Sequence, residues 1–67
     1  MDRRIERGRA TCDHLVTVAT ELFAEHGYEH TSIEAVLEQT GVSRGSLYHH
    51  FASKQALFEA VVEKVEV

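Results

Sequence analysis

The chain has 67 residues, of which 43% are hydrophobic and none is proline, and its formal net charge is -4. This length allows one domain at most, and such a chain buries only about 60% of its unfolded surface. Cys12 is the only cysteine, which excludes an internal disulfide and predicts a reducing, cytoplasmic location. No apolar run approaches the roughly 18 residues of a membrane span, and Asp13 and His14 interrupt any signal-peptide core.

The charges are segregated along the sequence. Residues 1–9 carry four arginines and two acids, whereas residues 10–38 carry six acids and neither lysine nor arginine. Residues 39–58 contain Arg44 and Lys54 and no acid. Because nucleic-acid binding depends on the local field, the acidic total weakens a nucleic-acid interpretation of this last segment without excluding it. A chance gap in the acids is the alternative.

The first predicted helix runs from about residue 9 to residue 26. Its apolar residues recur at three- and four-residue intervals: Cys12, Leu15, Val16, Ala19, Leu22 and Phe23. This spacing makes one apolar stripe. Gly27 is expected to end the helix in a Schellman stop, in which Phe23 and Tyr28 touch. Residues 1–8 are predicted to be a flexible basic arm, and a solvated tail is favoured over an ordered minor-groove arm.

A second, short helix is predicted directly after the first. Thr31 and Glu34 in T-S-I-E form a capping-box pattern. Its apolar face consists of Ile33, Val36 and Leu37. The helix should reach about Gln39, and Gly41 should stop it as Gly27 stops the first.

Two further helices follow at short intervals. Ser43 is a good N-cap for a third helix that ends near His50, with Leu47 and Phe51 facing inward. Ser53 is the predicted cap of a fourth helix, whose apolar stripe is Leu57, Phe58, Val61, Val62 and Val65. No alternating segment is long enough for a strand, so the predicted fold is all-α.

Two helices joined by a tight glycine turn, the second short and polar at its start, are typical of a helix-turn-helix. Arg44 in the first turn can make a bidentate contact to guanine O6 and N7. Gly45 lets the backbone come close to a sugar-phosphate, and Ser46 can donate to a base or a phosphate. The acids are absent from this segment, on this interpretation, because they would face DNA phosphates.

The residues after Ser46 suit the DNA backbone. Tyr48 and His49 lie one turn further on, where hydroxyl and imidazole donors can reach phosphates. Lys54 opens the next helix, whose free N–H groups and dipole favour an anion. Other interpretations remain open: a solvated surface residue for Arg44 or Lys54, a half-buried packing residue for Tyr48, and a core histidine for His50.

The five histidines do not predict a metal site. His26 and His30 are separated by the helix-ending Gly27, and His49 and His50 are adjacent residues whose side chains are expected to diverge. No thiol pair or carboxylate completes a tetrahedral ligand set. No nucleophile, base and orienting group converge at a recognisable spacing either, so we expect no metal, no cofactor and no enzymatic activity.

Residues 9–64 resemble the N-terminal DNA-binding domain of the TetR family of bacterial transcriptional regulators. The matching segments are A-T-E-L-F-A-E-H-G-Y, T-S-I-E and T-G-V-S-R-G-S-L-Y-H-H-F-A-S-K. The resemblance implies a homeodomain-like bundle over residues 9–67, with a three-helix core plus a fourth helix. It also implies contacts to phosphates from Thr31 and Ser32, to the groove from Ser43, Arg44, Gly45 and Ser46, and to the DNA backbone from Tyr48, His49, His50 and Lys54.

The resemblance further implies a transcriptional regulator, usually a repressor but in some cases an activator, that binds double-stranded DNA as a homodimer on a palindromic operator. Family members usually continue into a ligand-binding and dimerisation domain, whereas this sequence stops at Val67, so the 67-residue chain alone is expected to be mainly monomeric. Leu37 and Thr40 stand where alanine is frequent in the family, and Leu37 is expected to open the angle between the second and third helices slightly.

A protein-interaction module is the competing function. The apolar stripe of the fourth helix is wide enough to be partly exposed, and an exposed stripe could dock a partner helix or a second chain. Alternatively, the stripe closes the bundle against the first helix.

Overall fold

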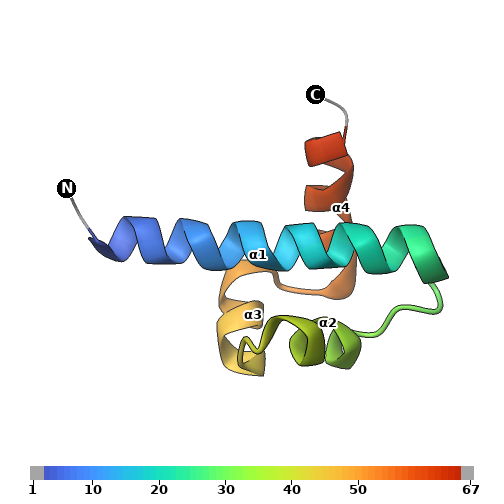
Figure 1. Cartoon of the computed structure of the whole chain (residues 1–67), viewed down its shortest axis with the longest axis horizontal. Helices are drawn as coiled ribbons and strands as arrows, with labels where there is room; N and C mark the ends of the chain where they lie inside the picture. The colour runs from blue at the N-terminus through green and yellow to red at the C-terminus, as the bar shows by residue number, and fades with distance from the viewer. Residues whose placement is uncertain (1–2, 66–67) are drawn as a thin grey trace.

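The computed structural model describes residues 3–65, with side-chain surroundings for residues 10–64. It contains four helices, α1 (Arg3–His26), α2 (Ile33–Thr40), α3 (Arg44–His50) and α4 (Lys54–Val65). α2 and α3 lie together on one side of the long helix α1, and α4 begins on that side and ends on the other (Figure 1). The described residues contain no strand, and the predicted all-α fold is confirmed.

α1 begins earlier than predicted. The helix starts at Arg3 rather than near residue 9, so it takes in most of the segment assigned to a basic arm. Residues 3–9 contain no proline and are mainly arginine and glutamate, which have high helix propensity. The helix therefore extends further toward the N-terminus than the apolar stripe from which its start was predicted. The flexibility of residues 1–8 stays a prediction.

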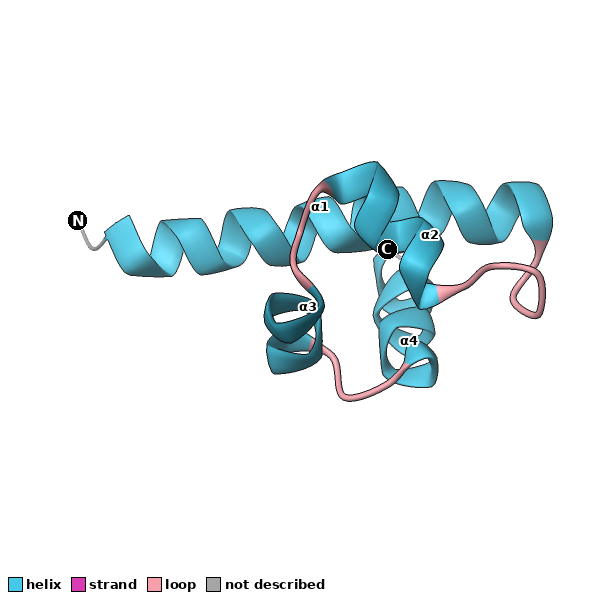
Figure 2. Ribbon diagram, turned by 90° about the horizontal axis from the view of Figure 1, so that it is seen from below, coloured by secondary structure: helices cyan, strands magenta, loops and turns pink. Residues whose placement is uncertain are grey.

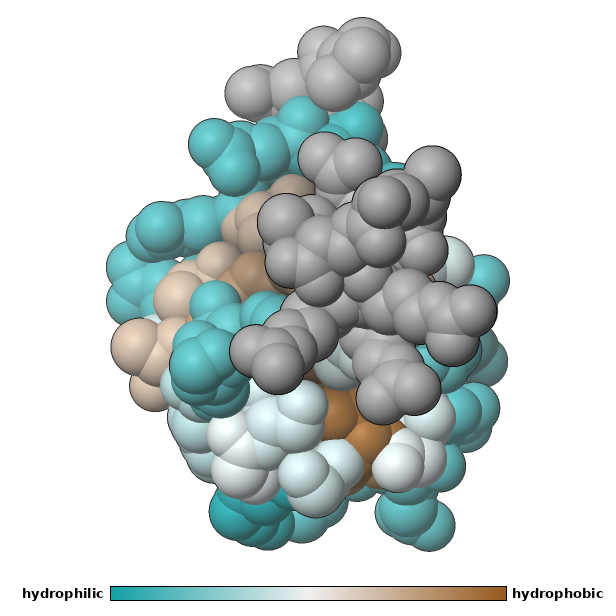
Figure 3. Space-filling model, turned by 90° about the vertical axis from the view of Figure 1, so that its left-hand side faces the viewer, coloured by the Kyte–Doolittle hydropathy of each residue, from teal (hydrophilic) through white to brown (hydrophobic). Residues whose placement is uncertain are grey.

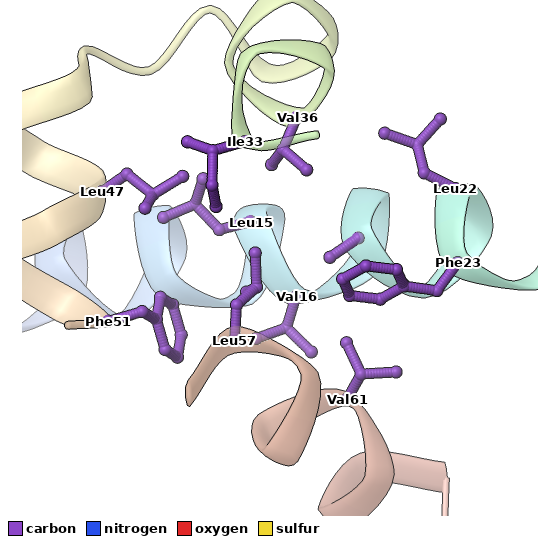
Figure 4. Packing of buried hydrophobic residues seen from close by; sticks show 11 residues of the cluster. Leu15, Val16, Leu22, Phe23, Ile33, Val36, Leu47, Phe51, Leu57 and Val61 are labelled. Atoms are coloured by element: carbon purple, nitrogen blue, oxygen red, sulfur yellow. The ribbon is translucent and has the colours of Figure 1, made fainter. Parts of the chain in front are cut away.

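One hydrophobic core joins all four helices (Figure 4). Its buried members are Leu15, Val16, Ala19, Leu22, Phe23, Ile33, Val36, Leu47, Phe51, Leu57 and Val61. The stripe predicted for the first helix is confirmed, with Cys12 only partly buried at its end. On α4 the predicted stripe divides, because Leu57 and Val61 are buried whereas Val62 is exposed.

Gly27 ends α1 as predicted, but through an αL motif and not the predicted Schellman motif. Gly27 has a φ of 86°, in the left-handed region, and its N–H donates to the Phe23 carbonyl at 2.8 Å. This single bond is that of the αL motif. The rings of Phe23 and Tyr28 are stacked with centroids 5.6 Å apart, which confirms their predicted contact.

α2 is capped by Ser32 and not by Thr31. The Ser32 hydroxyl accepts a hydrogen bond from the Ala35 N–H at 3.1 Å. Thr31, the predicted cap, is buried instead. With Ser32 as the N-cap, the N3 residue is Ala35 and not a glutamate, so the predicted capping box is wrong. Both residues are of a type that caps helices, and tertiary burial of Thr31 decides between them.

Candidate nucleic-acid interface

A short turn fixes α3 against α2. Gly41 has a φ of 73°, and its N–H donates to the Leu37 carbonyl at 2.8 Å. The Thr40 hydroxyl donates to the Val36 carbonyl at 2.8 Å and accepts from the Val42 N–H at 3.2 Å. A threonine at this position therefore bonds both to the end of α2 and to the turn, which an alanine side chain cannot do.

The start of α3 carries a cap and no acid. Ser43 is the N-cap, as predicted, and its hydroxyl accepts from the Ser46 N–H at 3.2 Å. The first turn of α3 contains no acidic residue. The N-terminal end of this helix can therefore approach phosphates without repulsion from a carboxylate of its own.

The inner face of α3 is locked into the core. Leu47 is 0% exposed and Phe51 is 8% exposed, and Figure 4 shows both side chains among those from the other helices. The Phe51 N–H donates to the Leu47 carbonyl at 2.8 Å, which closes the last turn. The inward orientation predicted for these two residues is confirmed, and it sets which residues of α3 face outward.

The outer face of α3 is open to solvent. Arg44, Gly45, Tyr48 and His49 are exposed, and Tyr48 is 41% exposed despite its size. Ser46 and His50 are partly buried at the edges of this face. In Figure 3 the lower part of the molecule, where α3 lies, is mainly pale to teal, with a small hydrophobic area. An exposed aromatic residue on a polar surface is suited to contact with a partner.

Of the two residues predicted to bind phosphate before α2, the structure leaves one accessible. Ser32 is exposed at the N-cap. Thr31 is 2% exposed, and its hydroxyl donates to the carbonyls of Gly27 at 2.8 Å and Leu22 at 3.1 Å. The Thr31 side chain therefore fastens the α1–α2 connection to α1. We exclude it from the candidate interface because a phosphate oxygen cannot reach a buried, already bonded hydroxyl.

Lys54 lies at the start of α4 and is held by an aromatic ring. Its Nζ is 4.3 Å from the centroid of Tyr28, a cation–π geometry. The Tyr28 ring in turn packs edge to face against the Phe58 ring, with the two ring centroids 5.0 Å apart. Ser53 caps α4 as predicted, and its hydroxyl accepts from the Ala56 N–H at 3.2 Å. The Lys54 ammonium is thus kept beside the N-terminal end of α4, to which the loop after α3 leads directly (Figure 2).

Arg44 has a partner that the sequence pattern did not reveal. Its Nη2 donates to Oε1 of Glu34 at 2.6 Å, across the turn from α3 to α2. The hydrogen bond from Arg44 lowers the pKa of the Glu34 carboxyl, with further contributions from the Glu34 backbone N–H and the positive charge of Arg44. The same bond raises the pKa of Arg44. Both groups therefore stay charged at neutral pH.

The pair corrects the expectation that this surface is free of acids. Residues 39–58 contain none, but folding brings Glu34 from α2 to the first turn of α3. The two residues are ten positions apart in the sequence, a separation that no helical period relates. Only the angle at which the two helices pack determines the contact.

Within the described part of the chain, no three histidine, cysteine or acidic residues lie close enough together to hold a metal ion. The rings of His49 and His50 lie edge to face with centroids 5.4 Å apart, so these two side chains do not diverge widely. Among the same described residues, no helix is long and apolar enough to span a membrane.

The sequence is similar to known regulatory proteins. The profile of the family described as "Bacterial regulatory proteins, tetR family" matches residues 15–61. The HTH-type transcriptional regulator UidR of Escherichia coli is 36% identical over 62 residues, which are 92% of this chain and 32% of the relative. The HTH-type transcriptional repressor AcnR of Corynebacterium efficiens is 46% identical over 46 residues, 69% of this chain and 24% of the relative.

A third relative is the A-factor receptor protein of Streptomyces griseus, 36% identical over 58 residues, which are 87% of this chain and 21% of that protein. The chain thus spans about a third or less of the length of these three relatives. The profile match covers most of the chain, including α2, the turn and α3. The chain therefore belongs to the TetR family of bacterial regulatory proteins.

Proposed function

We propose that this chain binds double-stranded DNA with α3 in the major groove, as the DNA-binding part of a transcriptional regulator. The family and the named relatives support regulation of transcription. The observation that carries the proposal is the division of α3 into a buried inner face and an exposed outer face to which α3 itself contributes no acid. The major groove admits one α-helix, and a helix locked on one side can read base edges with the other.

The proposed roles follow from position and exposure. Arg44, at the start of α3, reads guanine O6 and N7. Gly45 gives room for close approach, because a Cβ built there meets no atom of the chain within 4 Å. Ser43 and Ser46 lie beside them at the groove, where their short side chains leave space for the base pairs.

The remaining roles are contacts to phosphate. Tyr48 and His49 extend the outer face of α3 along the DNA backbone, with His50 at its edge. Ser32 and Lys54 lie at the N-terminal ends of α2 and α4, where free backbone N–H groups and the helix dipole favour an anion. Phosphate contacts fix the register of the protein on the duplex and carry no sequence information of their own.

We further propose that the intact protein represses transcription as a homodimer on a palindromic operator, consistent with the printed name of AcnR as a repressor. Two copies held together read two half-sites about one helical turn apart. The 67-residue chain alone should be mainly monomeric and should bind a palindrome little better than a half-site. Its affinity should lie in the non-specific range, with Kd roughly 10⁻⁴–10⁻⁶ M at physiological salt.

A salt titration of binding to an arbitrary duplex tests the proposal. We expect the logarithm of the affinity to fall linearly with the logarithm of the salt concentration. The reason is that cationic side chains bound to phosphates displace the counterions condensed on the DNA. The competing function is a protein-interaction module built on the partly exposed surface of α4, where Val62 is exposed and Phe58 partly buried. Absence of salt-dependent DNA binding, together with dimerisation through α4, would favour that module.

A further inference from the structure

The ion pair between Glu34 and Arg44 stands on the surface that we propose to face DNA. The two side chains are 63% and 55% exposed, so solvent and ligands can reach both. Exposed ion pairs stabilise folded proteins little, and the turn between α2 and α3 is already fixed by Gly41 and Thr40. Fold stability therefore does not account for the pair.

The geometry of the pair leaves most donors of Arg44 free. One guanidinium nitrogen, Nη2, donates to one carboxylate oxygen of Glu34. A guanidinium has five N–H donors in a planar fork, so donors remain for a second, coplanar partner. Guanine O6 and N7 form such a partner. Glu34 can therefore stay bound while Arg44 contacts a base.

The pair also changes what attracts Arg44. An isolated arginine is drawn to any phosphate, because phosphates are anionic and match its fork. Next to Glu34 the local net charge is close to zero, and the carboxylate repels phosphate oxygens. The donors of Arg44 remain available to the neutral acceptors of a base edge. Specificity rises when binding to the wrong sites is weakened in this way.

We propose that Glu34 is a positioning residue that holds Arg44 for base reading and withholds it from the phosphate backbone. This inference rests on the proposed function, because it assigns a specificity role within the same interface. A flexible arginine side chain loses freedom when it binds, and a guanidinium held in advance loses less. Glu34 thus orients Arg44 before DNA arrives and lowers its affinity for arbitrary sequence.

The first test measures salt slopes on an arbitrary duplex for the wild type, Glu34→Gln, and the control Glu38→Gln. Glu38 is exposed one turn further along α2, so its variant removes the same charge without breaking the pair. We expect Glu34→Gln to bind more tightly and to raise the salt slope by about one, because Arg44 then contacts a phosphate. Glu38→Gln should leave the slope unchanged. Equal slopes for the two variants would overturn the proposal.

A double variant separates Glu34 from its partner. In an Arg44→Gln background, Glu34→Gln should no longer change the slope, since no guanidinium remains to be released. Circular dichroism checks that each variant is folded. If the wild type shows no salt-dependent binding to duplex DNA, the proposed function itself fails. If the wild type binds and Glu34→Gln raises the slope equally with and without Arg44, only the role of Glu34 fails.

The second test measures specificity by selection of binding sites from a random duplex library. The wild type and Glu38→Gln should select guanine at one position of the half-site. Glu34→Gln should bind the library more tightly and lose part of that preference. Retention of the full guanine preference by Glu34→Gln would contradict the positioning role.

Discussion

The two faces of α3 differ in what fixes their residues. Leu47 and Phe51 are held by contacts within the chain, since both lie in the core with residues of the other three helices. Arg44, Gly45, Tyr48 and His49 are exposed, and packing within the chain does not account for their identity. Substitutions on the inner face should therefore act on stability, and substitutions on the outer face on DNA binding.

The largest expected effect is on the inner face. Leu47→Ala should lower the free energy of unfolding by roughly 2–5 kcal/mol, because it leaves a cavity at a fully buried position. Chemical denaturation followed by circular dichroism measures the change. Leu47→Met is the matched control and should cost less than about 1.5 kcal/mol. Tyr48→Ala, on the outer face, should change stability by no more than about 0.5 kcal/mol. Equal losses for Leu47→Ala and Tyr48→Ala would contradict the division.

The next largest loss of stability is expected from substitution of Gly41, in the turn between α2 and α3. Gly41→Val places a β-branched residue at a φ of 73°, and the cost should exceed about 1 kcal/mol because such residues avoid this region. A built Cβ meets no atom within 4 Å, so the penalty is conformational rather than steric. Gly41→Asn should be milder, since asparagine tolerates the left-handed conformation. Thermal denaturation of the two variants tests this order, and equal losses would speak against it.

Substitution of Gly45 should have opposite effects on the stability of the fold and on DNA binding. Its φ is not positive and its surroundings are open, so Gly45→Ala should raise stability by roughly 0.5–1 kcal/mol through helix propensity. DNA binding should weaken, because the added methyl group occupies space proposed for the DNA. Denaturation and fluorescence anisotropy on one preparation measure both effects. A variant that is more stable and binds DNA as well as the wild type would remove Gly45 from the interface.

The smallest expected effect is on the phosphate contact at α4. Lys54→Ala should weaken binding to all sequences about equally and lower the salt slope by about one. Lys64→Ala is the matched control, because Lys64 lies near the other end of α4, where its Nζ donates to the Thr17 hydroxyl at 2.8 Å. The control should leave the slope unchanged. Similar slopes for the two variants would mean that Lys54 makes no specific phosphate contact.

Local signals in the sequence were enough for most of the fold. Each of these signals joins residues that are only a few positions apart. They are the apolar spacing of α1, the glycines that end α1 and α2, and the caps Ser43 and Ser53. The boundaries that were wrong lie where local signals are equivocal. Thr31 and Ser32 are both good caps, and only the burial of Thr31 separates them. Asp2, directly before Arg3, is of a type that caps helices, but the start was predicted from the apolar stripe, which begins only at Cys12.

The contacts within the candidate site could not be predicted from the sequence, because they join residues of different helices or connections. Lys54 rests on Tyr28, and Arg44 bonds to Glu34. Both contacts depend on the angles between helices and not on spacing along one helix. The exposure of Gly45 and His49, by contrast, follows from the inward position of Leu47, since residues two positions away lie on the opposite side of a helix.

The central claim is that the outer face of α3 enters the major groove, and an NMR titration tests it most directly. A ¹⁵N-labelled chain titrated with a duplex should show its largest amide shift changes in residues 43–50, with further changes at Ser32 and Lys54. Residues 59–64 on α4 should be little affected. Changes confined to the exposed surface of α4, or none at all at low salt, would contradict the account.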